Sequence, residues 1–184
     1  RGASQAIKKL AENGVINIDA SELLDEYMPQ ESVPEWAQKD IVLGEAQSDS
    51  LRRIISAIDS REFKPFLLHG ITGSGKTEVY IDAIHHSIAK GLGVLVIVPE
   101  IALTPQLIDR FRAQLGDNLA VLHSALSKRS RWDSWRALLE GRSLIAIGAR
   151  SGIFAPVENL GLIIVDEEHD GSFKQSDSLR YNAR

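Results

Sequence analysis

Short apolar runs recur at intervals through the second two-thirds of the chain. They lie at 65–69, 94–98, 119–122, 144–147 and 162–165. Each run is apolar at nearly every position, which is typical of parallel strands that are buried on both faces of a sheet. The pattern therefore predicts five buried strands.

Segments with apolar residues at every third or fourth position separate most of these runs. They lie at 45–59, 76–90, 104–115 and 127–140 and predict amphipathic helices. The residues expected on their buried rows are Leu51, Ile54, Ile55, Ile58, Tyr80, Ile84, Ile88, Leu107, Phe111, Leu115, Trp132, Trp135 and Leu139. The alternation of strands and helices predicts an α/β fold, with a parallel β-sheet flanked by helices on both sides.

The first 44 residues differ from the rest of the chain. Residues 1–28 contain two short helical patterns around the apolar run VINI, and 29–44 hold two prolines without a clear period. We expect 1–28 to be a small separate segment, 29–44 a linker and 45–184 the α/β domain. Because the chain begins with Arg1 and ends at Arg184 within a polar stretch, we expect it to be a piece of a longer protein.

Composition narrows the class of protein. The 184 residues are 43% apolar and 25% charged, as in soluble globular proteins, and no run approaches the roughly 18 apolar residues of a membrane span. The absence of cysteine excludes disulfides and thiolate metal sites in this segment. A net charge of −4 does not favour nucleic-acid binding, so any such site must be a local patch. Residues 128–136 carry four Lys and Arg, either as such a patch or as a solvated helix face.

A glycine-rich loop follows the 65–69 run and precedes the 76–90 helix. It matches the phosphate-binding pattern G-x-x-x-x-G-K-S/T at every defined position, with the residues Gly70, Ile71, Thr72, Gly73, Ser74, Gly75, Lys76 and Thr77. The glycines let main-chain amides surround an anion, and the helix presents its positive end. Lys76 then reaches the β- and γ-phosphates of ATP, and the Thr77 hydroxyl is a ligand for Mg²⁺.

Two acidic residues follow the last apolar run. The run delivers Asp166 to the carboxyl edge of the sheet, where ligands bind in open α/β folds. We expect Asp166 to hold Mg²⁺ and Glu167 to act as the general base on the attacking water. The alternative is a solvated acidic turn.

Residues 166–169, DEEH, resemble the D-E-x-H box of superfamily 2 helicases. Four further stretches, GITGSGKTEVY, VPEIALTPQ, LHSALS and GARSGIFAPVENLGLIIVDEEHDGSFKQ, make the resemblance close. The chain resembles the bacterial replication-restart DNA helicases, densely over 65–184 and more weakly over 45–64. The most specific stretches are VPEIALTPQ and DEEHDGSFKQ.

This resemblance implies a P-loop NTPase fold, namely the first of two RecA-like helicase lobes, and a partial winged-helix segment over 1–28. The implied activity is ATP-driven 3′-to-5′ unwinding of DNA at stalled forks, followed by primosome assembly, in the bacterial cytoplasm. The implied cofactors are ATP and Mg²⁺, without zinc in this segment. The implied partners are forked and single-stranded DNA, primosome proteins and single-strand binding protein, without a membrane. Lacking the second lobe and its arginine, the piece alone is expected to hydrolyse ATP poorly.

The resemblance also implies roles for residues outside the phosphate loop. Gln47 would read the adenine edge, the alternative being an exposed polar residue near a helix start. The residues expected to contact DNA are Thr104, Pro105, Arg150, Ser151, Phe173, Lys174 and Tyr181. The alternatives are a helix cap for Thr104 and Pro105, a surface charge for Arg150, and a frayed tail for the stretch after the box. His169 would link the nucleotide site to the stretch after the box; the alternative is a buried, hydrogen-bonded histidine.

Two other functions are compatible with the phosphate loop alone. A P-loop switch or adaptor would bind ATP without mechanical work and would need no residues facing DNA. A small-molecule kinase would need a lid and a cluster of substrate-binding arginines, and no segment has either pattern.

Overall fold

The computed structural model describes residues 42–124, 126–175 and 180–183. The expected winged-helix segment and nearly all of the expected linker lie outside these residues. The described helices are α2 (Glu45–Ser60), α3 (Lys76–Ala89), α4 (Pro105–Leu115) and α5 (Lys128–Leu139). The described strands are β1 (Gly93–Ile97), β2 (Leu119–Leu122), β3 (Ile145–Gly148), β4 (Leu160–Val165), β5 (Lys174–Gln175) and β6 (Tyr181–Asn182). Short 3₁₀ turns lie at Glu100–Ala102, Gly116–Asn118, Arg150–Phe154 and Gly171–Phe173.

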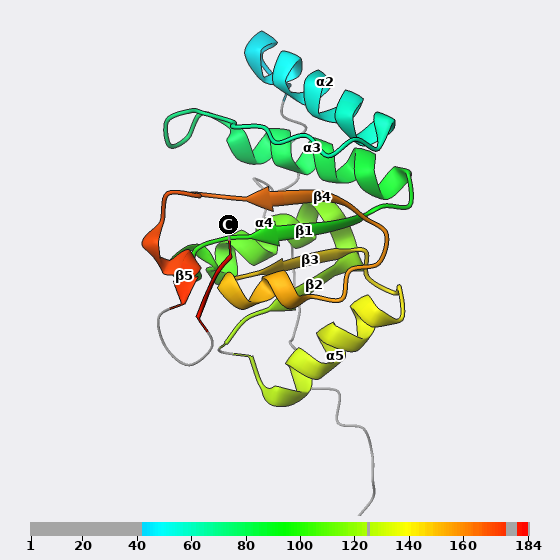
Figure 1. The fold of residues 1–184 in the computed structure, drawn as a ribbon, viewed down its shortest axis with the longest axis vertical. Helices are drawn as coiled ribbons and strands as arrows, with labels where there is room; N and C mark the ends of the chain where they lie inside the picture. The colour runs from blue at the N-terminus through cyan, green and yellow to red at the C-terminus, as the bar shows by residue number, and fades with distance from the viewer. Residues whose placement is uncertain (1–41, 125, 176–179, 184) are drawn as a thin grey trace, which may run out of the picture.

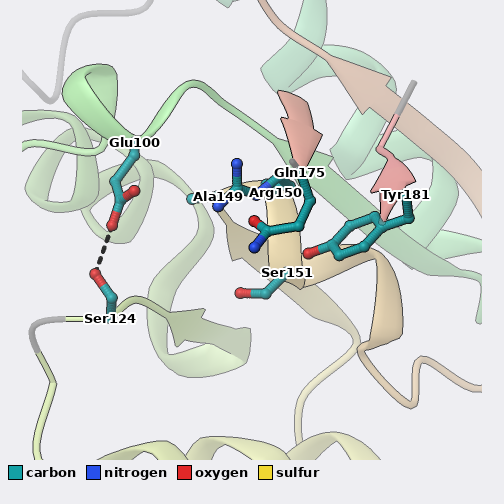
Figure 2. Close-up of a pocket in the computed structure, with 7 residues that line it drawn as sticks. All are labelled: Glu100, Ser124, Ala149, Arg150, Ser151, Gln175 and Tyr181. Carbon is teal, nitrogen blue, oxygen red and sulfur yellow. Dashed lines mark hydrogen bonds between the residues drawn. The ribbon is translucent and has the colours of Figure 1, made fainter. Parts of the chain in front are cut away.

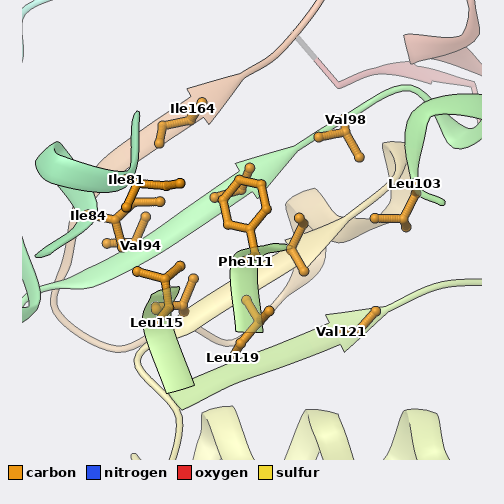
Figure 3. Close-up of a cluster of buried hydrophobic side chains, with 13 residues drawn as sticks. Ile81, Ile84, Val94, Val98, Leu103, Phe111, Leu115, Leu119, Val121 and Ile164 are labelled. Atoms are coloured by element: carbon orange, nitrogen blue, oxygen red, sulfur yellow. The ribbon is translucent and has the colours of Figure 1, made fainter. Parts of the chain in front are cut away.

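The strands β1 to β4 form a parallel sheet with the order β2-β3-β1-β4. Successive side chains of a strand point to opposite faces, so each face of this sheet needs its own cover. On one face Val94 and Val96 pack with residues of α3 and α4, and Phe111 of α4 fills the centre (Figure 3). On the other face Leu95 and Ile97 pack with Leu138 of α5. The expected α/β architecture with helices on both faces is confirmed (Figure 1).

The prediction of a strand over 65–69 is wrong. None of these residues is in a strand, and the side chains of Phe66 and Leu67 are 42% and 78% exposed. In Figure 1 the segment between α2 and α3 crosses in front of α3 and does not join the sheet. A strand is stable only when its main-chain groups are paired, and Pro65 has no N–H to donate. Apolar composition alone therefore did not make this run a strand.

Two expectations about burial are also wrong. On α5, Trp132 and Leu139 are 60% and 56% exposed, whereas Leu138 is buried. The strand β4 is not buried on both faces, because Leu160 and Ile163 are 43% and 53% exposed, whereas β2 at the other edge of the sheet is largely buried. An apolar run does not reveal which of its side chains the rest of the fold will cover.

Candidate functional site

The glycine-rich loop leads directly into the N-terminus of α3. Gly75 is the N-cap of α3 and has a φ of 77°, and Gly73 has a φ of 80°. These left-handed conformations suit glycine, because a side chain there is strained. The first amides of a helix have no acceptor within the helix, so the loop and the start of α3 direct main-chain donors to one place.

The ammonium group of Lys76 folds back into the loop. Its Nζ donates to the carbonyl oxygens of Gly70 at 2.7 Å and Ile71 at 3.1 Å. Of the ion pairs among the described residues, none involves Lys76, so none of their carboxylates lies within ion-pair distance of its ammonium group. Main-chain amides and an uncompensated ammonium are the donor set that an anionic phosphate chain needs. The residues present therefore fit a nucleoside triphosphate.

The amide of Gln47 joins α2 to the phosphate loop. Its Nε2 donates to the carbonyl oxygen of Ser74 at 2.9 Å, and its Oε1 accepts from the main-chain N–H of Gly44 at 2.7 Å. A Cβ added to Gly75 would lie 2.4 Å from this Nε2. Contact with adenine remains a prediction, and the structure adds a contact that fixes the loop from outside.

The two acids lie at the carboxyl end of β4. The main-chain N–H of Asp166 donates to the Ile97 carbonyl, which fixes the strand end. The Oδ1 atom of Asp166 accepts from the N–H of Glu167 at 3.0 Å, and Glu167 has a left-handed φ of 47°. This turn directs the two adjacent side chains away from the regular alternation of the strand.

The side chain of Tyr80 connects this turn to α3. Its hydroxyl donates to Oδ1 of Asp166 at 3.3 Å. Burial, together with the negative charge of Asp166, raises the pKa of the Tyr80 phenol well above its usual value, so the phenol keeps its proton. Tyr80 lies one helical turn after Lys76, so Asp166 and the phosphate loop lie at the same edge of the sheet.

The protein supplies few direct metal ligands. Within 42–124, 126–175 and 180–183, no group of three or more His, Asp or Glu side chains could hold a metal ion. Mg²⁺ keeps several waters and is usually bound by one or two protein oxygens plus phosphates. A hydroxyl from Thr77 and a carboxylate from Asp166 suit that mode of binding, and the two remain predicted ligands.

A cavity of about 260 Å³ lies beside the carboxyl ends of β1 and β3. It is lined by Glu100, Ser124, Ala149, Arg150, Ser151, Gln175 and Tyr181. Figure 2 shows Glu100 and Ser124 on one side, joined by a hydrogen bond of 2.6 Å, and Gln175 and Tyr181 on the other. Three residues expected to contact DNA, Arg150, Ser151 and Tyr181, are thus brought together here.

Two of these residues have protein partners in the structure. The guanidinium of Arg150 donates to the carbonyl oxygens of Ser172 at 3.1 Å and Lys174 at 3.2 Å. The ring of Tyr181 meets the ring of Phe154 edge to face, with centroids 5.1 Å apart. Arg150 therefore anchors the segment that follows the acidic turn, a role different from the expected grip on a phosphate.

The expected stacking role of Phe173 is corrected by the structure. Its side chain is 1% exposed and packs with Leu95, Ile97 and Leu138 under the sheet. A ring without an exposed face cannot stack on a base. The neighbouring Lys174 is exposed, and its contact with DNA remains a prediction.

The remaining expected DNA contacts are at the start of α4 and on α5. The hydroxyl of Thr104 accepts from the N–H of Leu107 at 3.3 Å and so caps α4, while Pro105 is exposed at its first position. On α5, Arg129 pairs with Asp133 and Arg136 with Glu140. These pairs within the helix favour the solvated face over a nucleic-acid patch at 128–136.

Comparison with known proteins identifies the family of this chain. The family model described as DEAD/DEAH box helicase matches residues 44–184. This chain belongs to the DEAD/DEAH box helicase family. The match covers the phosphate loop, the acidic turn and the cavity beside them, so one helicase domain contains all three.

Curated relatives of this helicase chain carry a common name, "Replication restart protein PriA". The protein from Bacillus subtilis is 42% identical over 182 residues, which cover 99% of this chain and 22% of that protein. The one from Synechocystis is 45% identical over 183 residues, 99% of this chain and 21% of that protein. The one from Haemophilus influenzae is 50% identical over 122 residues, 66% of this chain and 17% of that protein. The chain thus spans about a fifth of the length of these relatives.

Sequence reasoning missed two contacts of this helicase domain. One is the hydrogen bond from Tyr80 to Asp166. The other is an ion pair between Arg110 of α4 and Glu78 of α3, whose side chain is 8% exposed. The burial of Glu78 next to Val79 on α3 was not apparent from a helix that also contains Asp82 and two histidines, and its partner was not identifiable from spacing. No helix in the described part of the chain is long and apolar enough to span a bilayer.

Proposed function

We propose that this chain is the ATP-binding first motor lobe of a replication-restart DNA helicase that unwinds DNA from 3′ to 5′ at stalled forks. The observation that carries the proposal is the common edge of the sheet, where Tyr80 ties Asp166 to the helix that bears Lys76 and Thr77. The names of the relatives support the process, replication restart. Forked DNA, primosome proteins and single-strand binding protein are the proposed partners.

Each residue of the nucleotide site has a distinct role in this proposal. When bound, Mg²⁺–ATP would supply a γ-phosphoryl group, and its transfer to water with ADP as the leaving group would release the energy for movement. Lys76 exchanges its two neutral carbonyl partners for phosphate oxygens, which are stronger acceptors because they are charged. Thr77 and Asp166 would contribute oxygens to the metal. Glu167 takes the proton from the attacking water.

DNA contact is proposed for the cavity beside the nucleotide site. Ser151 and Tyr181 supply a hydroxyl and an aromatic ring, and Gln175 supplies an amide. Arg150 holds the segment that contains Gln175, and this segment continues directly from the acidic turn. A DNA strand bound in this cavity would therefore contact the same segment of chain that bears Glu167. Such a contact would couple DNA binding to ATP hydrolysis.

The proposal is tested on the full-length protein by ATPase assay with and without single-stranded DNA. The expected results are stimulation by DNA, and unwinding of partial duplexes with a 3′ tail but not of those with a 5′ tail. ATP binding without DNA stimulation would favour the switch or adaptor instead.

Two substitutions separate binding from chemistry in the same assay. Lys76→Ala should abolish nucleotide binding and turnover, whereas Lys90→Ala at the other end of α3 should leave both intact. Glu167→Gln should keep nucleotide binding and reduce hydrolysis at least about 100-fold, within the range for loss of a general base. If Lys76→Ala kept its turnover, the loop assignment would fail.

A further inference from the structure

The hydroxyl of Tyr80 has a polar partner in an otherwise apolar setting. The ring is half-buried and packs against the core on the face of the sheet covered by α3 and α4. A phenylalanine would fill the same space, so packing alone does not require the hydroxyl. The hydroxyl reaches Asp166, which lies 86 residues further along the chain.

Among the described residues, two hydrogen bonds reach the Asp166 carboxylate, and both end on the same oxygen. Oδ1 accepts from the Tyr80 hydroxyl at 3.3 Å and from the Glu167 N–H at 3.0 Å. Two donors from different directions fix the rotation of the carboxyl plane. The other oxygen, Oδ2, accepts no hydrogen bond within the described part of the chain, so it is the oxygen left for a ligand.

Tyr80 is also rigidly connected to the phosphate loop. It lies four residues after Lys76 and three after Thr77 on α3, positions that share one face of a helix. A hydrogen bond from this face therefore sets the position of Asp166 relative to the Thr77 hydroxyl. The two predicted metal ligands come from separate elements, and Tyr80 is a direct link between those elements.

We propose that Tyr80 is a positioning residue that orients the Asp166 carboxylate for the metal, and so makes nucleotide binding depend on Mg²⁺. This inference rests on the proposed function, because it assumes that the loop binds a nucleotide with its metal. Tyr80 itself touches neither the nucleotide nor the metal and acts through Asp166.

The test compares Tyr80→Phe with the wild type in the full-length protein. Equilibrium binding of a fluorescent ATP analogue is measured with Mg²⁺ and again with EDTA, and the ratio of the two dissociation constants gives the gain from the metal. Tyr80→Phe should reduce this gain roughly fivefold, because one hydrogen bond to a carboxylate contributes modestly. Affinity in EDTA should stay unchanged, since the loop and Lys76 are intact.

A control distinguishes positioning from a general effect on α3. Ser87→Ala also removes a buried hydroxyl from α3, but that hydroxyl is bonded to the Ala83 carbonyl, within the helix. Ser87→Ala should leave the metal gain at its wild-type value. The melting temperatures of the two variants, followed by circular dichroism, should lie within a few degrees of the wild type.

The outcomes are separable from those of the proposed function. If the wild type bound the analogue in neither buffer, the nucleotide site itself would be wrong. If the wild type bound it with a metal gain and Tyr80→Phe showed an equal or larger gain, the positioning role would be overturned. A smaller gain in Tyr80→Phe together with weaker binding in EDTA would also overturn it, because the substitution would then disturb the loop as a whole.

Discussion

At the scale of single residues, Gly75 of the phosphate loop meets two separate structural requirements. Gly75 adopts a left-handed φ of 77°, and it leaves room for the Gln47 amide that holds Ser74. The motif pattern explains the first requirement. The second follows only from the approach of α2, which is not visible in the motif.

Substitution of Gly75 by alanine should therefore affect more than backbone strain. The left-handed conformation costs a non-glycine residue about 1–2 kcal/mol, and the new Cβ would also displace Gln47 from Ser74. We expect Gly75→Ala to weaken nucleotide binding at least about tenfold, since the lost Gln47 contact adds roughly 1 kcal/mol. Titration with a fluorescent ATP analogue measures this.

Gly91→Ala is the matched control for this substitution. Gly91 has a similar φ of 70° but an added Cβ would meet nothing within 4 Å. It should lose a comparable amount of stability in urea denaturation while binding nucleotide normally. Equal nucleotide affinities in the two variants would show that the contact with Gln47 does not matter.

At the scale of elements, one ion pair joins the two helices on the same face of the sheet. Arg110 of α4 donates to Glu78 of α3, and the side chains are 33% and 8% exposed. Loss of Arg110 alone is costly, because the buried carboxylate of Glu78 is then left without a partner. The phosphate loop leads into the N-terminus of α3, so this ion pair also helps to hold the loop in place by fixing α3 against α4.

Removal of one partner should cost far more than removal of both. Arg110→Met should lower the free energy of unfolding by about 3 kcal/mol, because it leaves the Glu78 carboxylate buried and unpaired. The double variant Glu78→Met with Arg110→Met should recover most of that loss. Urea denaturation of the single and double variants measures both values, and a double variant as unstable as Arg110→Met would contradict the expectation.

Elements also differ in how far the sequence predicted them. Residues 94–98, 119–122, 144–147 and 162–165 were predicted as strands and match β1, β2, β3 and β4, because each of these runs pairs with at least one parallel neighbour in the sheet. The run at 65–69 has similar composition but no strand partner, and pairing is a property of the fold rather than of the run. On α5 there are more apolar residues than buried positions. The periodicity therefore predicted burial of Trp132 and Leu139, whereas Leu138 is the residue that is buried.

At the scale of the whole molecule, the site was predictable in its parts and not in its connections. The phosphate loop and the acidic turn were identified from local pattern, since each follows from the needs of phosphate and metal chemistry. The links from Tyr80 to Asp166 and from Arg150 to Lys174 join residues distant in sequence. No local pattern encodes such pairs, because topology decides which strand ends meet.

The position of β4 has a consequence for the chain as a whole. Among the described residues β4 pairs only with β1, so the main-chain groups along its outer side face no strand. Leu160 and Ile163 are 43% and 53% exposed on the same strand. Exposed, flat and apolar strand edges are templates on which further copies can add.

Concentrated solutions of the isolated chain should therefore scatter light, because copies associate through the β4 edge of the sheet. Ile163→Lys should suppress the scattering, because a charge at a strand margin opposes the addition of another strand. Leu139→Lys is the fitting comparison, since that leucine is 56% exposed but belongs to a helix and should change little. How concentrated a solution of this chain can be kept would then depend on an edge strand of its own sheet as well as on the charge of the molecule.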